Sequence, residues 1–197
     1  CSSDLAVIVM VSAGRGAEKR ILDQIRDMGT DLITVSAGQT RIVAGRQRQM
    51  STVVTLRAAD AAAIADACPA VARAAPAIAK KLAVRWEAEN TNTSVGGMDA
   101  QGFPIRNMTI AAGRIFDAEE GRAARRLAVV GPTVVENLFG SADPLGRQIR
   151  IGRVPFEVIG VLHAKGVDPN GMDHDDLVVV PLQTAMRRLM NVVHVET

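Results

Sequence analysis

The chain has 197 residues, of which 48% are hydrophobic and 22% are charged, as expected for one large folded domain or two small ones. Its 23 basic and 21 acidic side chains leave a net charge of +2, which falls far short of the positive field that binding to a nucleic-acid backbone requires. Aromatic residues make up only 3%, with no tyrosine, so the core must consist mainly of aliphatic side chains.

An apolar segment, LAVIVMVSAG from Leu5 to Gly14, lies near the start of the sequence. It is shorter than the ~20 residues of a membrane-spanning helix. Standing alone it would be a core segment. Because charged residues follow it at once, as they do where a helix leaves the lipid, residues 1–14 would also suit the outer end of a truncated transmembrane helix. A lipoprotein start at Cys1 is the third, ranked last because a signal peptide would place the apolar run before the cysteine.

The next segment reads as a helix followed by a strand. Isoleucine, leucine and methionine recur at helical spacing from Ala17 to Met28, and Gly29 stands where a C-cap belongs. Asp31 to Gly38 is predicted to be a short strand, because apolar residues there are flanked by turn residues. The polar, arginine-rich stretch from Gln39 to Gln49 predicts a hairpin or loop.

A second helix is predicted from Arg57 to about Ala67, with Thr55 as a possible cap and a proline ending it. Cys68, just after this helix, is expected to be a small buried hydrophobe, and the two cysteines of the chain do not indicate a disulfide framework. Val71 to Ile78 is predicted as a strand, at a sheet edge because it contains a proline.

Lys81 to Glu89 alternates apolar residues (Leu82, Val84, Trp86 and Ala88) with charged ones, which predicts a strand with one solvated face. The asparagine- and threonine-rich stretch NTNTSVGGM at 90–98 is interpreted as a connector. Glycines and a proline crowd together around it, so we expect a boundary between subdomains after residue 98.

The second half of the chain carries well-marked local signals. An Asp starts a helical turn, and a Pro at the first helical position and a terminal Gly delimit a longer helix. The segments predicted are an edge strand or turn at Ile110–Phe116, a helical turn at Asp117–Arg122, a buried strand at Leu127–Val130, a helix from Gly131 to Gly140, a hairpin of Gln148–Ile151 with Val154–Leu162, a polar loop at 165–176, a strand at Leu177–Val180, a helix at Gln183–Met190 and the start of a strand at Val192–Glu196.

Three groups of arginines recur along the chain, each among polar or turn residues, and a solvated face is the favoured interpretation. The groups are Arg41, Arg46 and Arg48; Arg122, Arg125 and Arg126; and Arg147, Arg150 and Arg153.

No motif predicts a catalytic or metal-binding residue. The stretch from Ser12 to Arg20 has glycines before a lysine but lacks the spacing of a phosphate loop. The carboxylates and imidazole of Asp173 to Asp176 could form a weak metal site, yet an exposed acidic turn is favoured. His163 and His194 are lone histidines without an orienting acid. The serines Ser36, Ser51 and Ser94 lack a nucleophile elbow.

Two further residues are weighed as contact points. Trp86 could anchor a partner, because an aromatic residue on a one-sided sheet is a common hot spot, but a core role is favoured. Asn92 begins a formal glycosylation tripeptide, which is a weak signal.

Four stretches together resemble the extracytoplasmic core domain of MacB-type permeases, the FtsX-like branch of ABC transporters. They cover nearly the whole chain in the order typical of that family. The stretches are GAEKRILDQIRDMGTDLITVSAG from Gly16, GRIF from Gly113, LAVVGPTVVENLFGSADPLGRQIRIGRVPFEVIGVLHAKG from Leu127 and DDLVVVPLQTAMRRL from Asp175.

The resemblance implies an α+β fold in which a porter-like subdomain of βαβ units carries an inserted small β-rich subdomain. Residues 15–98 and 166–197 would form the porter-like part, incomplete at its C-terminus, and residues 99–165 the inserted part. The stretch from Gly131 to Val161 falls in the inserted part, as a scaffold.

The resemblance also implies an inner-membrane transporter whose domain lies on the periplasmic or extracellular side. Partners would be a second permease copy, an ATP-binding domain or subunit, the membrane through flanking helices and, in some members, a periplasmic adaptor. The domain would transmit motion from ATP hydrolysis to export, with no catalytic residue or cofactor of its own. A secreted or lipid-anchored binding module is the alternative, and a hydrolase using Asp173 to Asp176 is a third hypothesis.

Overall fold

The computed structural model describes residues 32–37, 39–43, 46–50, 56–167 and 173–192. The chain divides into two compact units, residues 1–33 and 34–197, and nearly all the described residues belong to the second. Predictions for the first apolar segment, the helix at 17–28, Thr55, Ser51 and His194 therefore lie outside the described residues.

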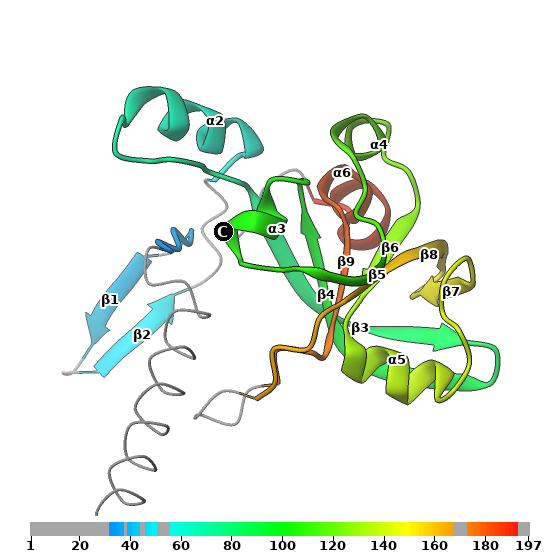
Figure 1. Ribbon diagram of the computed structural model, residues 1–197. Coiled ribbons are helices and arrows are strands. Elements are labelled where there is room, and N and C mark those ends of the chain that lie inside the picture. The colour runs from blue at the N-terminus through cyan, green and yellow to red at the C-terminus, as the bar shows by residue number, and fades with distance from the viewer. Residues whose placement is uncertain (1–31, 38, 44–45, 51–55, 168–172, 193–197) are drawn as a thin grey trace, which may run out of the picture. The chain divides into compact units, whose positions relative to one another are not determined.

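A seven-stranded sheet forms the body of the second unit, in the order β5-β8-β6-β9-β4-β3-β7 (Figure 1). Pairing between β4 and β9 and between β6 and β8 is parallel, and the other pairs are antiparallel. The strands are β3 (Ala77–Trp86), β4 (Glu89–Met98), β5 (Ile110–Gly113), β6 (Leu127–Val130), β7 (Gln148–Ile151), β8 (Val154–Leu162) and β9 (Leu177–Pro181).

The sheet closes on itself. β8 pairs with β6 along one side and, along its other side, with β7 near its start and β5 near its end. β7 also pairs with β3 at the far end of the strand order, through Val84↔Ile151 and Arg85↔Arg150. Six strands therefore form a ring, β8-β6-β9-β4-β3-β7, to which β5 is added outside.

Alternation along each strand separates an inner from an outer face of this ring. The inward residues are almost all aliphatic and form one buried cluster, so the interior is packed. Members from the strands are Ile78, Val84, Val95, Ala128, Val130, Ile149, Ile151, Phe156, Val158, Val178 and Val180.

Part of the outer face is also buried, under a second cluster. Val129 of β6 and Val179 of β9 point outward into it, so these two strands are covered on both sides. Phe103, in the short helix α3 (Gly102–Ile105), and Phe116 pack edge to face at 5.4 Å within the same cluster. The fully buried sequence LAVV of β6 follows from this double coverage.

Helices complete the inner core. α5 (Pro132–Phe139) buries Val134, Leu138 and Phe139 against it. After β9 the chain forms α6 (Leu182–Thr184) and continues as a π-helical segment, η1 (Ala185–Met190), which ends at a left-handed Asn191. Leu182 and Ala185 contribute to the same cluster from this second helix.

Several sequence predictions are confirmed where local chemistry is strong. α5 begins with a proline and ends at Gly140, whose φ is +57°. Asp117 caps the short helix α4 (Ala118–Arg122), because its carboxylate accepts the Glu120 amide at 2.7 Å. The buried strand β6, the edge strand β5 and the hairpin β7–β8 also form as expected. The same holds for the strand predicted at Leu177–Val180, which is β9, and for the helix predicted at Gln183–Met190, which is α6 and η1.

The prediction of a connector at 90–98 was wrong, because this stretch is strand β4 in the middle of the sheet. β4 pairs with β3 in unbroken register from Ala77↔Met98 to Trp86↔Glu89 and with β9 on its other side. Its asparagines and glycines are typical of turns, so the sequence predicted a connector here. Tertiary pairing on both edges stabilises a strand that its asparagines and glycines alone do not favour.

Two other predicted strands were wrong or misplaced. Leu32–Ala37, within the predicted strand 31–38, forms no strand, and Leu32, Ile33 and Val35 are exposed. A strand needs a neighbour for its backbone groups, and none of the described strands pairs with this segment. The predicted strand at 71–78 begins only at Ala77, in β3.

The first described elements are a hairpin and a solvated helix. β1 (Gln39–Val43) and β2 (Arg46–Met50) pair antiparallel, which confirms the hairpin alternative for residues 39–49. α2 (Ala58–Ala67) matches the predicted helix, and its start is held by Asp60, whose carboxylate accepts the Arg57 amide at 2.7 Å. No side chain of α2 is fully buried.

The strands of the predicted inserted part, residues 99–165, do not stand apart from the others. β6 pairs with β9, and β7 pairs with β3, so strands from both predicted subdomains alternate in one sheet. The division at residues 98 and 165 therefore remains a prediction, whereas the α+β class is confirmed.

Gly97 should be a position where a single methyl group lowers stability. A Cβ at Gly97 would overlap the Cβ of Ala185 and lie 3.0 Å from Cγ2 of Ile78. We expect Gly97→Ala to lower the free energy of unfolding by about 1–3 kcal/mol through overpacking, measured by urea denaturation. Gly96→Ala is the matched control, because its Cβ meets nothing closer than 3.9 Å. Equal effects of the two substitutions would contradict the packing described.

Candidate functional site

The acidic segment at 173–176 is the first candidate, and the structure gives it a structural role. The prediction of an exposed turn was wrong for Asp175, which is buried. Its carboxylate accepts the backbone N–H of Lys165 at 2.7 Å and that of Gly166 at 2.9 Å. Burial of this charge is compensated by these two hydrogen bonds, which hold the end of the loop after β8 against the start of β9.

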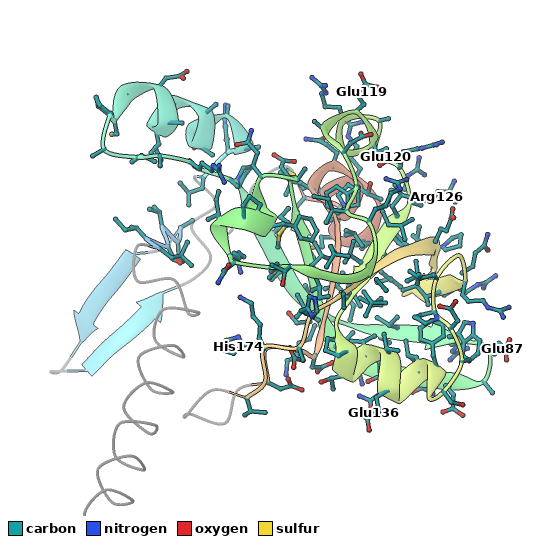
Figure 2. The ribbon with its side chains drawn as sticks, viewed as in Figure 1. Glu87, Glu119, Glu120, Arg126, Glu136 and His174 are labelled. Atoms are coloured by element: carbon teal, nitrogen blue, oxygen red, sulfur yellow. The ribbon has the colours of Figure 1, made fainter. Side chains whose placement is uncertain are left out.

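Asp173 extends the same junction to helix α5. One of its carboxylate oxygens accepts the Asp175 amide at 2.8 Å, and the other accepts the Thr133 hydroxyl at 2.9 Å. The Gly131 amide donates to the Leu177 carbonyl at 2.8 Å, and a side chain at Gly131 would overlap the Asp175 carbonyl. The segment therefore joins three parts of the chain. His174 is exposed at its edge (Figure 2).

In the described part of the chain, the histidines and serines considered from the sequence are not joined to one another by hydrogen bonds. His163 is exposed directly after β8, and no hydrogen bond in the described ranges joins its imidazole to Ser94 or to the acidic segment. Ser36 lies in the exposed stretch before the hairpin. Within residues 32–37, 39–43, 46–50, 56–167 and 173–192, no group of three His, Cys, Asp or Glu side chains could hold a metal ion.

Three other candidates fall on the core or on the surface. Trp86 is half-buried and packs on Phe139 with ring centroids 4.6 Å apart, which confirms the core interpretation. Cys68 is exposed, contrary to the prediction, because α2 packs too little of itself for its end to be covered. Asn92 is exposed on the outer face of β4.

An ion pair ties α4 to the segment after β5. The Arg114 guanidinium contacts both carboxylate oxygens of Glu120, at 2.7 and 2.8 Å, and Glu120 also accepts the Asp117 amide at 3.0 Å. The hydrogen bonds from Arg114, followed by that from Asp117, lower the pKa of Glu120 to about 2. The same pairing raises the pKa of Arg114. Glu120 is the middle residue of α4 and lies nearer the sheet than Glu119 does (Figure 2).

The outer face of β3 and β7 is the most distinctive surface of the domain. We call it the basic face and define it by the exposed, outward-pointing residues Lys81, Arg85 and Arg150. Arg85 and Arg150 stand directly opposite each other in the register. The other outward positions of β4, β3 and β7 are uncharged: Ala79, Ala83, Asn90, Asn92, Ser94 and Gln148.

Sequence reasoning found only part of the basic face. The sequence indicates a group of arginines, Arg147, Arg150 and Arg153, and a solvated side of β3. It does not indicate that the two features lie next to each other. The pairing of β3 with β7 brings the two sets together, and these strands are more than 60 residues apart along the chain. Spacing along the sequence carries no signal of such a contact.

A comparison with protein families decides the identity of the fold. Residues 5–196 match the family model described as the MacB-like periplasmic core domain. The chain belongs to this family. The resemblance read from the sequence is therefore confirmed: the chain is a MacB-like periplasmic core domain.

Relatives of this core domain are parts of longer proteins. The macrolide export ATP-binding/permease protein MacB of Rhodospirillum rubrum is 38% identical over 185 residues, which cover 93% of this chain and 28% of the relative. The protein of the same name from Azoarcus sp. is 35% identical over 184 residues, covering 93% and 27%. The chain thus spans less than a third of the relatives it matches.

Solved structures support the fold. The periplasmic region of MacB from Actinobacillus actinomycetemcomitans aligns with a TM-score of 0.70 at 19% identity, covering 90% of this chain and 77% of that one. The extracellular domain of the noncanonic ABC-type transporter YknZ from Gram-positive bacteria aligns with a TM-score of 0.62 at 20% identity, covering 73% and 71%. Among the residues that the structure describes, no helix has the length and apolar character to cross a membrane.

Asp175 should stabilise the MacB-like domain through its two backbone hydrogen bonds. We expect Asp175→Ala to lower the free energy of unfolding by about 3 kcal/mol, because two amides lose a charged acceptor. Hydrogen exchange of the Lys165 and Gly166 amides should accelerate in parallel. Asp143→Ala is the matched control, because Asp143 is exposed and accepts only the nearby Leu145 amide. Unchanged exchange at Lys165 and Gly166 would contradict this role.

Glu120 should make stability depend on pH in the acidic range. Its pKa is lowered in the folded state, so its contribution is present above its ordinary pKa of 4.5 and is lost as pH falls toward about 2. We expect Glu120→Gln to be less stable at neutral pH and to flatten the decline of stability between these values, measured by thermal unfolding. Glu119→Gln, on the same helix, should keep the wild-type profile, and a flattened profile there would count against the assignment.

Proposed function

We propose that this domain is the extracytoplasmic part of an ABC permease of the inner membrane, and that it couples cytoplasmic ATP hydrolysis to export by mechanical transmission. The observation that carries the proposal is the match of residues 5–196 to the MacB-like periplasmic core domain. The names of the relatives, which are macrolide export ATP-binding/permease proteins, support the coupling to ATP.

Under this proposal the domain itself carries no catalytic residue, and ATP is hydrolysed by a separate nucleotide-binding domain or subunit. A second permease copy, the flanking membrane helices and a periplasmic adaptor are its partners. Residues 1–14 form the outer end of a membrane helix. Residues 15–98 and 166–197 belong to a porter-like part, and residues 99–165 to an inserted part.

The packing of the ring suits the transmission of motion. A ring closed by strand pairing, with a packed aliphatic interior and helices α5 and η1 against it, moves as one body, because close-packed interiors deform little. Force applied at one end of such a body reaches its opposite face. The segment at 17–28, predicted from the sequence to be an amphipathic helix, would connect this body to the membrane helix.

Transmission through the segment at 17–28 can be tested by making the connection flexible. In the full-length permease, a Gly/Ser linker of about ten residues inserted between Gly29 and Thr30 should abolish export while ATP hydrolysis continues, because such linkers do not transmit force. The same linker inserted between Glu87 and Ala88, at the exposed tip of the β3–β4 hairpin, is the control and should preserve export. Full export with the first insertion would refute mechanical transmission by this route.

A further inference from the structure

We propose that the inside of the strand ring binds one water molecule, between the Thr93 hydroxyl of β4 and the Asp176 carboxylate just before β9. The water accepts a hydrogen bond from Thr93 and donates one to Asp176. It joins the two strands one residue before their backbone pairing begins at Ser94↔Leu177. The inference concerns the interior of the domain and does not depend on the proposed transport function.

The first argument is that two buried oxygen atoms lack partners. Thr93 is fully buried, with 0% of its surface exposed. Among the residues that the structure describes, neither its Oγ1 nor the buried Oδ1 of Asp176 has a hydrogen-bond partner. A buried hydroxyl or carboxylate oxygen without a hydrogen bond destabilises a fold, so such atoms in proteins almost always bond to another group or to water.

The second argument is that the two oxygens belong to neighbouring positions. β4 and β9 run parallel, and Val95 stands opposite Val178 in their register. Both valines belong to the inner core. Thr93 and Asp176 each precede these valines by two residues, so the same register places them side by side on the inner face. Neighbouring strands lie about 5 Å apart, and a water molecule can bridge two polar side chains that do not reach each other.

The third argument is the contrast with nearby buried polar groups, which have direct partners. Both carboxylate oxygens of Asp175 accept backbone amides, and those of Asp173 accept an amide and a hydroxyl. Thr184, a second fully buried threonine, donates to the Arg125 carbonyl at 2.8 Å. The two unpartnered oxygens are therefore a local exception. Their position next to each other favours one shared partner over two separate defects.

Water fits these two groups better than a metal ion does. A water molecule can accept a hydrogen bond from a hydroxyl and donate one to a carboxylate at the same time, and a buried water has roughly two to four such partners. A calcium ion takes about six to eight oxygen ligands. In the described part of the chain, no group of three His, Cys, Asp or Glu side chains could hold a metal ion.

A crystal structure of the full 197-residue chain, at a resolution that shows ordered water, tests the site directly. We expect a water molecule within hydrogen-bonding distance of Thr93 Oγ1 and Asp176 Oδ1. Thr93→Ser keeps the hydroxyl and should keep this water. A wild-type structure in which the two side chains bond directly to each other, or in which no water lies between them, would overturn the inference.

The sign of a stability change gives a second test. Thr93→Val should lower the melting temperature by about 2–5 °C, because the bound water and Asp176 lose a hydrogen-bonding partner. If the hydroxyl has no partner at all, the same substitution removes an unsatisfied polar group. The melting temperature then stays unchanged or rises, and the inference fails. Thr91→Val is the matched control and should change the melting temperature little, because Thr91 lies on the same strand but is only half-buried.

Two further measurements separate a shared water from other arrangements. The loss of melting temperature in Thr93→Val/Asp176→Ala should be smaller than the sum of the two single losses, because both residues bind the same water. Additive losses would show that the two side chains share no partner, against the inference. If calcium or magnesium chloride raises the melting temperature of the wild type but not of Asp176→Ala, the site binds a cation and the inference is wrong.

Discussion

The closure of the strand ring by β7 is the constraint on which the rest of the domain depends. β7 is four residues long, and it contacts β3 through only two register pairs, Val84↔Ile151 and Arg85↔Arg150. Its other edge follows β8 in full, from Gln148↔Glu157 to Ile151↔Val154. Because side chains alternate between faces, a slip of one residue in either pairing would turn Ile149 and Ile151 out of the core. The register of β7 with β8 and its register with β3 therefore depend on each other.

Closure also explains why the same strands serve two purposes. Their inward side chains fill a packed interior, and this interior needs no contribution from the outer face of β3 and β7. Elsewhere on the ring the outer face is buried under α3 and the segment around Phe116. Packing therefore does not restrict the outer side chains of β3 and β7, and a charged residue such as Arg85 is tolerated there.

Much of the fold could be predicted from the sequence where the signal is local. A proline at the first turn and Gly140 at the end define α5, and alternation defines β7 and β8. β4 could not be predicted, because its Asn and Gly residues are unfavourable in a strand unless neighbouring strands pair on both edges. The burial of Asp175 was missed for a related reason: its two amide partners lie nine and ten residues away. The basic face depends on a longer-range contact still, between β3 and β7.

Arg85 and Arg150 occupy one of the two register pairs that close the ring, so two like charges lie opposite each other where the pairing is shortest. The other pair, Val84↔Ile151, is fully buried in the aliphatic interior. Closure of the ring at β7 therefore depends on the burial of the inward side chains and not on the outward pair.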